Sequence, residues 1–291
     1  MVRINTAWNI LPSMRFISVT LLSILCVSAC AVAPPSLTDS PGPMQEPSPT
    51  REVPILTPIE SAFAPGNPTA APLDDIQASH VATFRTTDGA TITGELYGSG
   101  ETAVIFSAMG NCKPGWRELA QLTAAQGLMA LTYPWRGCRE SGSTNETELR
   151  KFVEDARGAI NFVREQGAER IILVGASLGG LASAKLAIES NAIGIVIVAS
   201  PPGVPQWGFE IESSDVNTEI PKLFITAEKD AVVPVSAARE LFDLAAEPKE
   251  WQTYPGTAHG TDLIQGETGE AAALRILEFV LTIAKPGNPI P

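Results

Sequence analysis

From about residue 75 to residue 285, short apolar runs alternate with segments in which apolar residues recur every three or four positions. The short runs predict buried strands, and the longer spacing predicts helices with one face on a core. We expect strands at residues 102–107, 128–133, 171–174, 193–199, 223–227 and 250–254. We expect helices at residues 116–126, 146–165, 181–189, 237–244 and 270–285.

A hairpin precedes this alternation. Residues 80–85 and 91–96 have strand-like patterns and are separated by Asp88-Gly89, a dipeptide typical of tight turns. An antiparallel hairpin followed by alternating strands and helices predicts an α/β fold. The expected architecture is a doubly wound, mostly parallel sheet with helices on both faces.

One strand-to-helix junction carries a nucleophile motif. The strand at residues 171–174 is followed by Gly175-Ala176-Ser177-Leu178-Gly179, which matches G-x-S-x-G. A tight turn there needs small neighbours and holds the Ser177 hydroxyl above the sheet edge. The Leu178 amide, at the start of the helix, would be placed to donate to an oxyanion. Without partners downstream, the same residues would be a glycine-rich turn with an idle serine.

A serine hydroxyl needs a base to become a good nucleophile, and the chain has two histidines. His259 lies downstream of Ser177 in the loop Gly256-Thr257-Ala258-His259-Gly260, whereas His80 lies at the start of the first strand. We take His259 as the candidate base and His80 as structural. The alternative is that His259 is an ordinary surface residue.

Residues from about Asp75 to Lys285 resemble the α/β-hydrolase family, in its compact form without a large cap, as in serine esterases of the dienelactone-hydrolase-like branch. The resemblance rests on the motif at Ser177, on Glu228-Lys229-Asp230 and on the loop around His259. Trp135-Arg136-Gly137-Cys138-Arg139-Glu140-Ser141-Gly142 is similar to the family's Arg-Gly-x-x-x-Ser-Gly turn. The order Ser, Asp, His is also that of the family.

This resemblance implies roles for further residues. Asp230 would orient the His259 ring, with Glu228 and Asp262 as competitors, and Asp155 would be solvated or structural. The second oxyanion amide would come from the loop after residues 102–107. Many relatives carry His-Gly there, and this chain carries Ser107-Ala108-Met109-Gly110-Asn111. The donor would then be the Met109 amide, or that of Ala108.

Residues 200–221 leave no room for the helical cap of larger relatives, so we expect a shallow, open site. Trp116, Trp135 and Trp207 either line a pocket or pack in the core.

The formal net charge of −12 argues against a nucleic-acid partner, because phosphate binding needs clustered Lys and Arg. The chain has no Cys-x-x-Cys or His-rich cluster, so a zinc site is not expected. No metal or organic cofactor is implied. The expected partner is a small-molecule ester or acyl compound, and the sequence does not reveal an oligomeric state.

The N-terminal segment resembles an export signal. Residues 16–27 are apolar, Arg3 and Arg15 are the only charges before Cys30, and Val27-Ser28-Ala29-Cys30 resembles a bacterial lipobox. We expect a signal peptide at residues 1–29, starting at Met1 or Met14, and lipid on the Cys30 thiol. The alternative is an ordinary secretory signal with a chance cysteine. Residues 30–74 are rich in Pro and predict an extended tether before a hydrolase domain at residues 75–291.

Export also permits a disulfide. With Cys26 in the signal and Cys30 lipidated, Cys112 and Cys138 remain. They follow the strands at residues 102–107 and 128–133, which are neighbours in the α/β-hydrolase fold. A Cys112–Cys138 bridge is therefore expected, with two unpaired thiols as the alternative.

The predicted function is that of a serine hydrolase that acts on a carboxylic ester outside the cytoplasm, lipid-anchored to a bacterial membrane. A peptidase or a thioesterase would use the same triad. A lipoprotein that only binds ligands on this fold is an alternative of another class.

Overall fold

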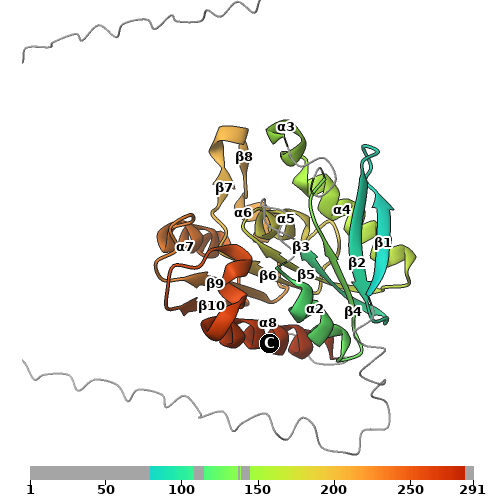
Figure 1. Ribbon diagram of the computed structural model, residues 1–291. Helices are drawn as coiled ribbons and strands as arrows, with labels where there is room; N and C mark the ends of the chain where they lie inside the picture. The colour runs from blue at the N-terminus through green and yellow to red at the C-terminus, as the bar shows by residue number, and fades with distance from the viewer. Residues whose placement is uncertain (1–78, 108–114, 137, 139–144, 286–291) are drawn as a thin grey trace, which may run out of the picture. The chain divides into compact units, whose positions relative to one another are not determined.

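The computed structural model describes residues 79–107, 115–136, 138 and 145–285. Its centre is an eight-stranded sheet in the order β1-β2-β4-β3-β5-β6-β9-β10 (Figure 1). β1 pairs with β2, and β2 with β4, in the antiparallel sense, and all other pairs are parallel. The predicted fold class, a mostly parallel α/β sheet, is confirmed.

The strands follow the apolar runs closely. They are β1 (Ser79–Arg85), β2 (Thr91–Tyr97), β3 (Thr102–Ser107), β4 (Met129–Tyr133), β5 (Arg170–Ala176), β6 (Gly194–Val198), β9 (Lys222–Ala227) and β10 (Lys249–Tyr254). The central strands β3, β6 and β9 are buried along their whole length, as expected for parallel strands covered on both faces.

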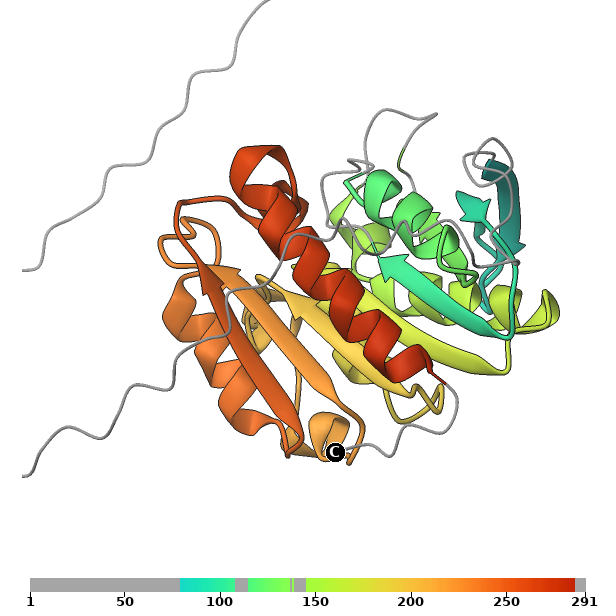
Figure 2. The ribbon, with the colours of Figure 1, turned by 90° about the horizontal axis from the view of Figure 1, so that it is seen from below.

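Helices cover both faces of the sheet. The helices are α2 (Arg117–Ala124), α3 (Glu146–Leu149), α4 (Phe152–Glu165), α5 (Leu178–Leu186), α6 (Ser213–Val216), α7 (Val235–Leu244) and α8 (Gly266–Ala284). Figure 2 shows α8 and α2 on the face turned toward the viewer. Side chains from α4, α5 and α7 form a second core on the other face. Along β3, Val104 and Phe106 point into the α2–α8 core and Ile105 into the other.

Two segments differ from the sequence prediction. The helix expected at residues 146–165 is divided into α3 and α4 by a turn at Arg150 and Lys151, although neither residue is a Gly or Pro. Residues 200–221, for which the sequence predicted no helix or strand and left no room for a large helical cap, hold a two-stranded hairpin and the short helix α6. The hairpin consists of β7 (Gly203–Val204), the 3-10 turn η2 (Pro205–Trp207) and β8 (Phe209–Glu210).

A buried ion pair joins the end of β4 to α4. The Arg136 Nε donates to Asp155 Oδ1 at 2.7 Å, and the Arg136 amide donates to Asp155 Oδ2 at 2.8 Å. The guanidinium also donates twice to Asp88, in the β1–β2 turn. The Asp155 side chain is fully buried and that of Arg136 is 5% exposed. Asp155 is thus a structural residue and not a solvated one.

Arg136→Met is expected to lower the free energy of unfolding by about 3–5 kcal/mol near neutral pH, since it leaves the Asp155 carboxylate buried without its cation. Burial already raises the pKa of Asp155 to about 6. When folding raises the pKa of a carboxyl, the folded protein loses stability as the pH rises through that pKa. The difference in unfolding free energy between the wild type and Arg136→Met should therefore be larger at about pH 8 than at about pH 5, as measured by denaturant unfolding.

The control for this prediction is Arg117→Met, which removes a more exposed ion pair with Glu95. An exposed pair contributes about 1 kcal/mol or less, so this variant should unfold nearly as the wild type does. Equal losses in the two variants would contradict a special role for the buried pair.

Among the described residues, no helix combines the length and apolarity needed to cross a bilayer.

Candidate active site

Ser177 occupies the turn between β5 and α5. Its φ of 53° and ψ of −117° are strained values for a residue with a side chain. The turn is so tight that a Cβ on Gly175 would lie 2.0 Å from the Gly179 carbonyl oxygen. The glycine at 175 is therefore required by a close approach of the backbone, as the sequence motif predicted.

Asp230 and His259 form a hydrogen-bonded pair. Asp230 follows β9 and His259 follows β10, and the distance from Asp230 Oδ2 to His259 Nδ1 is 2.8 Å. Asp230 Oδ1 accepts hydrogen bonds from the Val232 and Val233 amides at 2.8 and 2.9 Å. The Asp230 side chain is fully buried, and that of His259 is 11% exposed. The carboxylate is thus fixed by its own loop, and its second oxygen holds the imidazole.

The competing acids are more exposed than Asp230 is. Glu228 and Asp262 are both exposed, and the hydrogen bond from the His259 ring goes to Asp230. The other histidine, His80, is an exposed residue of β1. Of the acids considered from the sequence, Asp230 has the geometry of a residue that orients His259.

Ser177, Asp230 and His259 all follow the carboxyl ends of parallel strands, β5, β9 and β10. Parallel strands end at the same edge of a sheet, so the three residues emerge at one edge. The structure brings Asp230 and His259 into direct contact and places Ser177 on the same edge, at the start of α5. Such an arrangement can perform nucleophilic catalysis.

Residues 103–284 match the model of the alpha/beta hydrolase family. The chain belongs to this family.

Solved structures and curated proteins are consistent with this membership. The esterase domain of a Rhodothermus marinus protein superposes with a TM-score of 0.56 at 18% identity, covering 70% of this chain and 98% of that domain. Esterase Est2 of Thermogutta terrifontis gives a TM-score of 0.58 at 18% identity, covering 74% and 96%. The uncharacterized protein YfhR of Escherichia coli K12 is 25% identical over 201 residues, which are 62% of this chain and 69% of YfhR.

The expected oxyanion donors fall in two regions of this alpha/beta hydrolase. Leu178 is the first residue of α5, where backbone amides have no partner within the helix. The other expected donors, Met109 and Ala108, lie outside the described residues, as does Cys112 of the same loop. The start of their loop is well fixed, because the Ser107 carbonyl accepts a hydrogen bond from Trp116 Nε1 at 2.8 Å.

The tryptophans considered from the sequence divide between the core and the β7–β8 hairpin. Trp116 and Trp135 are 2% and 1% exposed, so both are core residues. Trp207, at the tip of the β7–β8 hairpin, is only partly buried, and its Nε1 donates to Glu146 Oε1 at 2.7 Å. The hairpin and α3 therefore meet at the top of the view in Figure 1.

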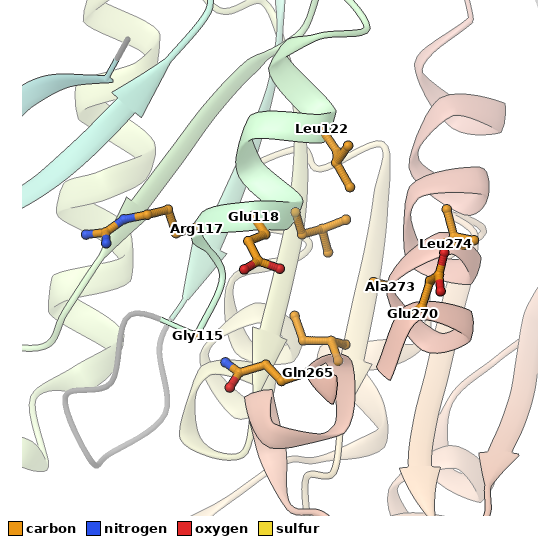
Figure 3. Close-up of a pocket in the computed structure, with 10 residues that line it drawn as sticks. Gly115, Arg117, Glu118, Leu122, Gln265, Glu270, Ala273 and Leu274 are labelled. Atoms are coloured by element: carbon orange, nitrogen blue, oxygen red, sulfur yellow. The ribbon is translucent and has the colours of Figure 1, made fainter. Parts of the chain in front are cut away.

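A cleft of about 690 Å³ lies between α2 and α8 (Figure 3). Its described lining includes the apolar side chains of Leu119, Leu122 and Leu274 and the carboxylates of Glu118 and Glu270. Ser177, Asp230 and His259 are not among the described lining residues, so this cleft is distinct from the candidate active site. The part of the chain that the structure describes contains no cluster of three His, Cys, Asp or Glu residues suited to a metal ion.

Proposed function

We propose that this alpha/beta hydrolase cleaves a carboxylic ester through an acyl-enzyme on Ser177. The observation that carries the proposal is the buried Asp230–His259 hydrogen bond at the same sheet edge as the strained Ser177. The esterase names of the fold's structural neighbours agree with this choice. A peptidase or thioesterase would use the same residues, and a non-catalytic binding protein would not need them.

The mechanism follows from the hydrogen bond. A carboxylate can only accept, so the His259 Nδ1 carries the proton and Nε2 is left as a base. Nε2 takes the Ser177 proton as Oγ attacks the ester carbonyl. His259 then protonates the departing alkoxide. A water molecule, deprotonated by His259, attacks the acyl-enzyme and releases the acid and Ser177. The amides of Leu178 and Met109 would stabilise the oxyanion in both steps.

A fluorophosphonate probe tests the class of function. The probe should label the wild-type protein at Ser177 and leave Ser177→Ala unlabelled, since it reacts with an activated serine. A wild-type protein that resists the probe would favour the binding protein. Rates on p-nitrophenyl esters of graded chain length, aminoacyl anilides and thioesters then separate the esterase from the peptidase and the thioesterase.

Location and cross-linking belong to the same proposal. We infer that residues 1–29 are removed, that Cys30 carries the lipid and that residues 30–74 tether the domain outside the cytoplasm at a bacterial membrane. These residues lie outside those described. Cys112 also lies outside the described residues, so the Cys112–Cys138 disulfide stays a prediction. It would tie down the loop that contains Met109, whose amide must stay fixed to meet the oxyanion.

A further inference from the structure

Two strained residues lie side by side at the ends of β5 and β6. Ser177 has a φ of 53° and Ala199 a φ of 49°, both in the left-handed region that side chains disfavour. The strands pair up to Ala176 and Val198, and the Ser177 amide donates to the Val198 carbonyl at 2.9 Å. The turn of the nucleophile is therefore built against the turn that follows β6.

Ser200, the next residue after Ala199, joins these two turns. It is 1% exposed, and its Oγ lies 2.8 Å from the Ser177 carbonyl oxygen and 3.2 Å from the Val198 carbonyl oxygen. A hydroxyl has only one proton to donate. The contact to the Ser177 carbonyl is the shorter of the two, so it is the main hydrogen bond. The same Ser177 carbonyl also accepts from the amides of Gly180 and Leu181 in the first turn of α5.

The Ser177 carbonyl and the Leu178 amide belong to one peptide group. A trans peptide is planar, and its C=O and N–H point in opposite directions. Any donor that fixes the Ser177 carbonyl therefore also fixes the direction of the Leu178 N–H. A hydrogen bond to the carbonyl also polarises the peptide and makes its N–H a better donor.

We propose that Ser200 is a positioning residue of the oxyanion hole: its hydroxyl holds the Ser177–Leu178 peptide plane so that the Leu178 N–H meets the developing negative charge. This inference rests on the proposed function. It also explains Gly180, which the G-x-S-x-G motif does not require. A Cβ at Gly180 would lie 2.0 Å from Ser200 Oγ, so only glycine leaves room for the hydroxyl.

The test replaces the Ser200 hydroxyl and measures kcat, KM and the affinity for a transition-state analogue. Ser200→Ala should lower kcat by about 10-fold to 50-fold, less than the roughly 10²-fold to 10³-fold loss of an entire oxyanion donor. KM should stay within about twofold, because the lost interaction is made in the transition state. A boronic acid that adds to Ser177 mimics the tetrahedral intermediate, so its affinity should fall by the same factor as kcat/KM.

Ser190→Ala is the matched control. Ser190 is also a buried serine whose hydroxyl donates to a backbone carbonyl, that of Leu186 at 2.7 Å, at the far end of α5. The melting temperature of the Ser190→Ala variant should fall about as much as that of Ser200→Ala, while its kcat and its affinity for the boronic acid stay unchanged. Ser200→Cys, with a weak S–H donor, should resemble Ser200→Ala and replaces it as the test if the alanine variant does not fold.

Gly180→Ala gives an independent measurement, because the new methyl group displaces the Ser200 hydroxyl. It should lower kcat as Ser200→Ala does, and the double variant should lose little more. Wild-type kcat and boronic acid affinity in the Ser200 variants would overturn the inference. An activity that survives Ser177→Ala would instead overturn the proposed function, so the two failures are distinguishable.

Discussion

Ser177→Ala and His259→Ala are each expected to lower ester hydrolysis by about three orders of magnitude or more, and the double variant should be little slower than either. The reason is that the hydroxyl and the imidazole act as one unit: the base has nothing to activate without the serine, and the serine is a poor nucleophile without the base. The measurement is kcat/KM on a p-nitrophenyl ester for the two single variants and the double variant.

His80→Ala is the control for the histidine, because His80 is exposed on β1, at the far edge of the sheet. It should retain wild-type activity. Losses that multiply in the double variant would mean that Ser177 and His259 act independently, and the proposed triad would then be wrong.

Asp230→Asn should lower kcat by about 10⁴-fold, the loss typical when the orienting carboxylate of such a triad becomes an amide. The physical reason lies in the loop. Val232 and Val233 donate to Oδ1, so the carbonyl of an asparagine would keep that place and its NH₂ would face His259. A donor at that position favours the tautomer with the proton on Nε2, which cannot accept the proton of Ser177.

Glu228→Gln tests the competing acid. Glu228 is exposed, two residues before Asp230, and the change should leave kcat nearly unchanged. A pH–rate profile should be measured for both variants, so that a shift of the pH optimum is not mistaken for a loss of activity. A damaging Glu228→Gln together with a mild Asp230→Asn would reverse the assignment of the acid.

The sequence by itself determined most of the strands and the positions of the candidate catalytic residues along the chain. Strands β3 and β9 lie at or within one residue of the predicted bounds, because a strand covered on both faces is apolar along most of its length. The turn at Ser177 was visible for a similarly local reason, since a Cβ at Gly175 would lie 2.0 Å from the Gly179 carbonyl oxygen, which excludes every side chain. Such constraints act within a few residues and leave a pattern in the sequence.

Only the tertiary structure decided which side chains meet. Trp207 and Glu146 are 61 residues apart, Arg136 and Asp88 are 48 apart, and Ser200 and Ser177 are 23 apart. Neither the turn that separates α3 from α4 nor the β7–β8 hairpin has an apolar period of its own. The hairpin is fixed by contacts such as that of Phe209 with Phe152, at a ring distance of 5.0 Å. These contacts depend on which strands are neighbours, and strand order is a property of the folded chain that no local pattern encodes.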